Sequence, residues 1–66
     1  MDLKIVGERL KKLRGDMTIK SLADRLGVVP SAVSMYENGQ RIPRDNVKIR
    51  YATIFGKTVE EIFFTK

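Results

Sequence analysis

The chain has 66 residues, 42% of them hydrophobic, which gives room for one compact domain with one core. It contains no cysteine and no histidine, so disulfide bonds and the usual zinc sites are excluded and stability must come from packing. The net charge of +5 favours a polyanionic partner, either nucleic acid or an anionic membrane surface, without choosing between them.

Apolar residues at the beginning of the chain recur at steps of three and four, as on one face of an amphipathic helix. They predict a helix over residues 2–14 that ends near Gly15 and carries Leu3, Val6, Leu10 and Leu13 on its apolar face. Thr18 then offers a side-chain N-cap for a second helix over residues 18–26, and Gly27 ends that helix.

Pro30 fits only the first turn of a helix, so a third helix is predicted over residues 30–38, with the Asn38-Gly39 pair as its C-terminal cap. A fourth helix is expected over residues 44–55. Thr58 and Glu61 have the spacing of a capping box, which predicts a fifth helix over residues 58–64. We therefore expect an all-α fold, a compact bundle of five helices formed by residues 1–66 as one domain.

The second and third predicted helices have the residue spacing of a helix-turn-helix unit. Ala23 is small enough for two helices to cross closely, Gly27 allows a positive φ in the turn, and Val33 packs the second helix of the unit onto the first. These three residues alone also fit an ordinary helical hairpin. The agreement of the turn at Gly27, the helix start at Pro30 and the basic flanks favours a unit that presents its second helix to the major groove.

Four segments together make the sequence similar to a known family: Gly7-Glu8-Arg9-Leu10-Lys11-Lys12-Leu13-Arg14, Leu22-Ala23-Asp24-Arg25-Leu26-Gly27-Val28, Tyr36-Glu37-Asn38-Gly39 and Arg41-Ile42-Pro43. From about Gly7 to Phe63 the chain resembles the Cro and phage-repressor type of helix-turn-helix domain, also called the xenobiotic-response-element regulator family. The resemblance implies a lambda-repressor-like five-helix fold, with the third helix in the major groove and the following loop against phosphates. It also implies a buried, structural ion pair between Arg14 and Glu37.

On the third helix, the residues expected to face the bases are Pro30, Ser31, Ser34 and Met35, with Ala32 partly exposed and Val33 and Tyr36 turned inward. None of them is an Arg, Asn or Gln that could bind guanine or adenine through two hydrogen bonds. The two serines can bond several base edges, and Met35 can contact a thymine methyl group. Because Arg, Asn and Gln are missing from this set, specificity is expected to rest partly on DNA shape and on Arg41 or Arg44 entering an adjacent narrow minor groove. The alternatives are that Ser31 only begins the helix and that Met35 serves a protein contact.

Residues before and after the third helix in the sequence carry hydrogen-bond donors or positive charges, so they are candidates for binding DNA phosphates. The set comprises Thr18, Lys20, Asn38, Gln40, Arg41 and Arg44. The alternative for the residues after the helix is a solvated turn. Lys48, Arg50 and Lys57 are expected only to raise the general positive field.

The expected function is sequence-specific binding of double-stranded DNA by a cytoplasmic transcriptional regulator that acts as a repressor. The usual catalytic constellations are missing from the sequence, so we expect no enzyme activity, cofactor, metal, small-molecule ligand or membrane association. A homodimer on a palindromic operator is expected, through the C-terminal helix, because one short helix has difficulty burying both Phe63 and Phe64. The rival is a protein-interaction module on the same fold, such as an antitoxin or anti-repressor.

Overall fold

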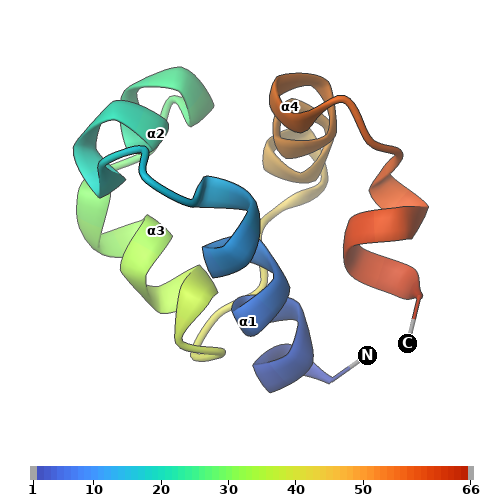
Figure 1. Cartoon of the computed structure of the whole chain (residues 1–66). Helices are drawn as coiled ribbons and strands as arrows, with labels where there is room; N and C mark the ends of the chain where they lie inside the picture. The colour runs from blue at the N-terminus through green and yellow to red at the C-terminus, as the bar shows by residue number, and fades with distance from the viewer. Residues whose placement is uncertain (1, 66) are drawn as a thin grey trace.

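The computed structural model describes residues 2–65, which form five helices and contain no strand. In chain order these are α1 (Leu3–Arg14), α2 (Ile19–Leu26), α3 (Pro30–Glu37), α4 (Asp45–Phe55) and η1 (Glu60–Phe64), a short π-helix (Figure 1). The predicted all-α, five-helix fold is confirmed.

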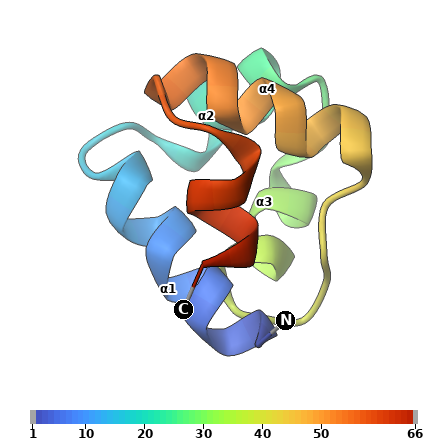
Figure 2. The same ribbon diagram turned by 90° about the vertical axis from the view of Figure 1, so that its right-hand side faces the viewer.

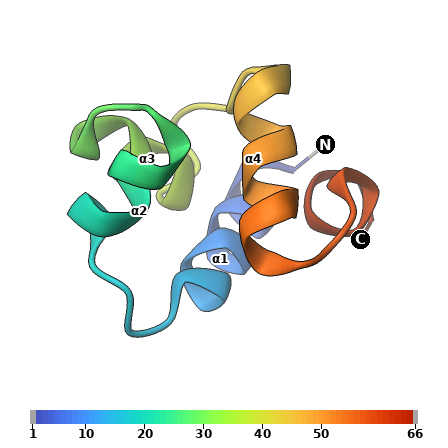
Figure 3. The same ribbon diagram turned by 90° about the horizontal axis from the view of Figure 1, so that it is seen from above.

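The helices are arranged with α2 and α3 on one side of the molecule and η1 on the other, as Figures 1 and 3 both show. Helix α1 packs against both α3 and η1, while α2 packs against α3 and α4. Figure 2 shows η1 lying beside α1 and α4. The largest fully buried side chains come from all five helices, and they are Leu10, Leu22, Leu26, Val33, Tyr51, Ile62 and Phe63. The α2–α3 unit therefore packs against the rest of the fold, α3 against α1 and α2 against α4.

Two of the helix beginnings have the side-chain caps that the sequence predicts. The Thr18 hydroxyl accepts a hydrogen bond from the N–H of Ser21 at 3.1 Å. In the capping box, the N–H of Glu61 donates to the Thr58 hydroxyl at 3.0 Å, and the N–H of Thr58 donates to the Glu61 carboxylate at 2.9 Å. This second bond lowers the pKa of Glu61, because the N–H stabilises the ionised carboxylate.

Close contact between α1 and α3 depends on the absence of a side chain at Gly7. A Cβ at this position would lie 2.5 Å from the carbonyl oxygen of Glu37 and 2.9 Å from that of Tyr36. Both neighbours are backbone atoms, which cannot rotate away as a side chain can. Gly7 therefore sets the distance between α1 and the C-terminal end of α3.

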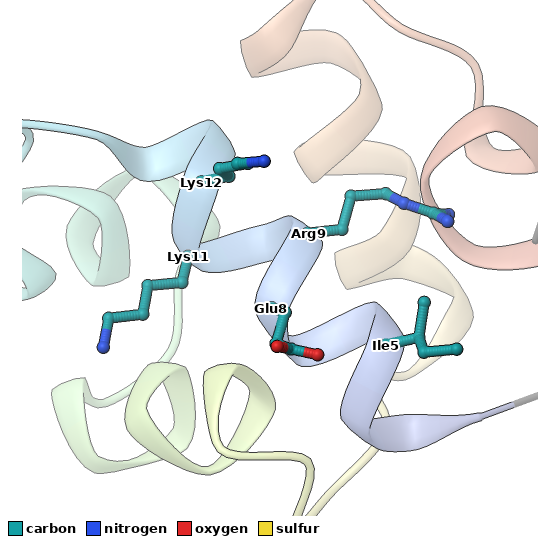
Figure 4. Close-up of a pocket in the computed structure, with 5 residues that line it drawn as sticks. All are labelled: Ile5, Glu8, Arg9, Lys11 and Lys12. Carbon is teal, nitrogen blue, oxygen red and sulfur yellow. The ribbon is translucent and has the colours of Figure 1, made fainter.

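The C-terminal helix η1 is held to α1 by one guanidinium group. Arg9 Nη1 donates to the carbonyl oxygens of Ile62 at 2.6 Å and Glu61 at 3.1 Å, and its Nη2 donates to that of Thr65 at 2.8 Å. In Figure 4 the Arg9 side chain extends toward the C-terminal helix, away from Lys11. A cation at the carbonyl end of a helix also interacts favourably with the helix dipole.

An aromatic cluster fills the centre of the fold around Tyr51. Its ring packs edge to face against Tyr36 and Phe63 and stacks with Phe55. Burial of Tyr51 raises the pKa of its hydroxyl, which has no hydrogen-bond partner among residues 2–65. Phe63 is buried in this cluster, whereas the neighbouring Phe64 is 58% exposed, so only one of the two phenylalanines finds the core.

Candidate nucleic-acid interface

Helix α3 has an exposed, uncharged face. Pro30, Ser31 and Met35 are exposed and Ser34 is half-buried. These residues recur at three- and four-residue steps, which places them on one side of the helix. The single charged residue of α3, Glu37, is turned inward and buried. The outward face therefore presents hydroxyl and apolar groups without charge.

The expectation that Ala32 is partly exposed is wrong, because this residue is buried. Ala32 and Tyr36 lie four residues apart and so share one side of α3, next to the side that carries Ser31 and Met35. Together with Val47 of α4, both line a hollow between the turn of the helix-turn-helix unit and α4. The periodicity of α3 alone contains no information on these neighbours from other parts of the chain.

The beginning of α3 is short of free hydrogen-bond donors. Pro30 has no N–H, and the N–H of Ala32 donates to the carbonyl oxygen of Val29 at 3.0 Å. Val29, in the N-cap position, provides no side-chain cap, and its side chain is 63% exposed. Val29 thus adds exposed apolar surface next to the uncharged face of α3, a feature that the sequence analysis missed.

Cationic and polar side chains follow α3 in the loop that leads to α4. Asn38, Gln40, Arg41 and Arg44 are all exposed. Arg41 and Arg44 also line the hollow of about 290 Å³ between the helix-turn-helix turn and α4, where Arg50 joins them. The structure thus brings two of the predicted phosphate-binding residues to one edge of α3, with a third guanidinium beside them.

The other two predicted phosphate-binding residues lie at the beginning of α2. Thr18 and Lys20 are both exposed. The Thr18 oxygen accepts the N–H of Ser21, which leaves its own hydroxyl hydrogen available as a donor. The exposed backbone at a helix beginning also favours a negatively charged group. The uncharged face of α3 consequently has a potential anion-binding group on α2 and another in the loop after α3.

The structure places Arg14 and Glu37 in direct contact. Arg14 Nε donates to Glu37 Oε2 at 2.7 Å and Arg14 Nη2 to Oε1 at 3.2 Å, which is a two-point contact. Arg14 Nη1 also donates to the carbonyl oxygen of Met17 at 2.7 Å. The hydrogen bond with Glu37 raises the pKa of Arg14. Since the pair joins the ends of α1 and α3 inside the fold, it positions the helices.

Arg50 has a role that sequence reasoning missed. Its Nη1 donates to the carbonyl oxygen of Leu26 at 2.7 Å and lies against Gly27, in the turn between α2 and α3. Gly27 has a φ of 73°, in the left-handed region, as a C-terminal cap requires. Arg50 thereby fixes α4 to the turn that sets the angle of α3. An arginine in the middle of a helix gives no sequence signal for a partner in another helix.

None of the helices within residues 2–65 has the length and apolar character needed to cross a membrane. The same residues contain no group of three or more potential ligands that could hold a metal ion.

A family model described as helix-turn-helix matches residues 9–62. The structure is similar to that of the restriction-modification controller protein C.AhdI from Aeromonas hydrophila, with a TM-score of 0.82 and 31% sequence identity over 94% of this chain and 97% of that chain. A search of curated protein sequences gives no match.

Proposed function

The chain belongs to the helix-turn-helix family of DNA-binding transcriptional regulators, and on this basis we propose that it is a sequence-specific repressor whose helix α3 reads the major groove. The observation that carries the proposal is the exposed, uncharged face of α3, which is preceded in the chain by the exposed Lys20 of α2 and followed by the exposed Arg41 and Arg44 of the loop. The major groove is wide enough for one α-helix, and phosphates line both of its edges.

In this proposal the flanking residues position the protein and α3 provides specificity. Thr18 and Lys20 bind phosphates at one edge of the groove, and Asn38, Gln40, Arg41 and Arg44 bind phosphates at the other. Ser31, Ser34 and Met35 meet the base edges together with the ring of Pro30. The Arg14–Glu37 pair acts indirectly, because it fixes the end of α3 against α1.

We further propose that the protein binds a palindromic operator as a homodimer through η1 and the adjacent surface of α4. Phe64 of η1 and Ile49 of α4 are both large, apolar and exposed. Lys48, the residue before Ile49 in α4, has its Nζ 5.2 Å from the centre of the Phe64 ring, so η1 and α4 meet beside these two exposed residues. A two-fold dimer would separate two copies of α3 by about 34 Å, one turn of DNA.

Selection of bound duplexes from a random DNA pool, at near-physiological salt, tests the proposal. Enrichment of one short palindromic site, with preferences that shift in Met35→Ala, is the expected result. Binding of all duplexes alike would contradict sequence-specific reading. Transcription in vitro from a promoter that contains the selected site then tests repression, since a repressor lowers and an activator raises the amount of product.

The phosphate contacts have a separate test. Arg41→Ala should weaken binding to every duplex by a similar factor and reduce the slope of log affinity against log salt by about one. The matched control is Lys57→Ala, which removes the same charge from an exposed site beyond α4. An Arg41→Ala protein with unchanged affinities would show that Arg41 is only solvated.

A protein-interaction module is the second candidate, and the exposed apolar side chains of Val29 and Met35 favour it. Salt dependence separates the two functions. Binding to DNA through several phosphates weakens steeply as salt rises, whereas an apolar protein contact responds little.

A further inference from the structure

The reading face of α3 contains more apolar surface than hydrogen-bonding readout requires. Val29 is 63% and Met35 40% exposed, and Pro30 lies between them in sequence with its ring exposed. A helical side chain leans toward the turn before its own Cα, so Met35 lies over the turn that contains Ser31. Val29 directly precedes this turn in the chain, so the beginning of α3 carries Ser31 together with two exposed apolar side chains.

The major groove offers one apolar group to such a surface, the C5-methyl group of thymine. A 5-methylcytosine carries the same methyl group at the same ring position. Thymine and cytosine also differ at the neighbouring C4 position, where thymine has an oxygen acceptor and cytosine has an amino-group donor. Hydroxyl groups both donate and accept, so Ser31 and Ser34 can tolerate either base.

We propose that α3 recognises the C5-methyl groups of pyrimidines through Val29 and Met35, an inference that rests on the proposed DNA-binding function. At the operator positions that these two side chains contact, thymine and 5-methylcytosine are then preferred over uracil and unmodified cytosine. The occupant is duplex DNA because the apolar face is uncharged while the cations lie beside it, which matches bases in the groove and phosphates at its edges.

The expected effect follows from the burial of one methyl group. Removal of a single contacted methyl group should weaken binding about fourfold, from the free energy usual for burial of one such carbon. A Met35 side chain that stays in solvent would give equal affinities for thymine and uracil. The thymine-to-uracil ratio thus measures the contact directly, since the hydrogen-bonding edges of these two bases are identical.

The experiment uses the selected operator in a fluorescence anisotropy titration of the full chain. In one arm each thymine is replaced in turn by deoxyuridine. In the other, the sensitive T·A pairs are replaced by C·G pairs with and without the C5-methyl group. We expect about fourfold weaker binding with uracil at one or two positions per half-site, and a similar gain when the cytosine there is methylated.

Variants then assign the effect to residues. In Met35→Ala or Val29→Ala the ratio of the uracil and thymine dissociation constants should fall toward one at the position that the side chain contacts. Ile5→Ala is the matched control, because Ile5 of α1 is 45% exposed and distant in sequence from α3. It should leave the ratio unchanged, whatever its effect on overall affinity.

The outcomes separate this inference from the proposed function. Specific binding of the operator that ignores uracil substitution at every position would overturn methyl recognition and leave sequence-specific binding intact. Sensitivity to uracil without a response to cytosine methylation would also overturn it as stated, because thymine alone would then be read. Failure to bind any duplex would overturn the proposed function, and this inference with it.

Discussion

Replacement of Gly7 by alanine sets two opposing effects against each other. Alanine is favoured over glycine inside a helix by about 1 kcal/mol. The new Cβ, however, would lie 2.5 Å from the carbonyl oxygen of Glu37 and 2.9 Å from that of Tyr36, so α1 and α3 must move apart. Overpacking of this kind usually costs about 1–3 kcal/mol, and contact with backbone atoms on both sides indicates the upper end.

We therefore expect Gly7→Ala to lower the free energy of unfolding by about 2 kcal/mol, the difference between these two effects. For a domain of this size that corresponds to a fall in Tm of roughly 8–16 °C. Urea and thermal unfolding followed by circular dichroism measure both quantities. Glu8→Ala, a change at the next and exposed position of α1, should alter stability by less than about 0.5 kcal/mol. A Gly7→Ala protein at least as stable as the parent would refute the close contact between α1 and α3.

Three further changes test the contacts that hold the helices together. Glu37→Ala should destabilise the fold by about 3 kcal/mol, because Arg14, only 16% exposed, keeps just the Met17 carbonyl oxygen as a partner; a loss below about 1 kcal/mol would identify a surface-like pair. Arg9→Ala removes the donor that holds the carbonyl end of η1 and should cost about 2 kcal/mol in urea unfolding, whereas the exposed Lys12→Ala should be nearly neutral. The lowered pKa of Glu61 means that its capping bond contributes stability above its ordinary pKa of 4.5 and that this contribution is lost as pH falls through the lower, folded-state pKa. The stability difference between the parent and Glu61→Gln should accordingly shrink in acid, and a difference that is constant with pH would contradict the capping role.

The class of fold was predictable because its signals are local. Apolar periodicity indicated the helices, Gly27 and Pro30 the turn between two of them, and Thr58 with Glu61 the capping box that the structure contains. Each of these signals depends on residues within one or two helical turns. The π-helical hydrogen bonding of η1 had no such signal, and neither did the choice of Phe63 over Phe64 for the core.

Contacts between distant segments could not be predicted in this way. Arg9 bonds residues more than fifty positions along the chain, and Arg50 bonds Leu26 from 24 positions away. Both side chains had the pattern of ordinary solvated cations, because a sequence does not reveal which carbonyl oxygens another helix leaves without partners. The burial of Ala32 belongs to the same class, since its neighbours in the hollow come from the turn after α2, from the loop after α3 and from α4.

The proposed contacts of the cations and of the apolar face of α3 should depend differently on salt concentration. If residues such as Arg41 bind phosphates as proposed, binding releases counterions and overall affinity should fall as salt rises. A contact between Met35 and a methyl group involves no charge, and Debye screening leaves it unaffected. The ratio of affinities for thymine and uracil operators should therefore stay constant while both affinities fall. If the ratio instead collapsed as salt rose, the preference would have an electrostatic origin, such as a change in groove shape sensed by arginine, and not a contact of α3 with the methyl group.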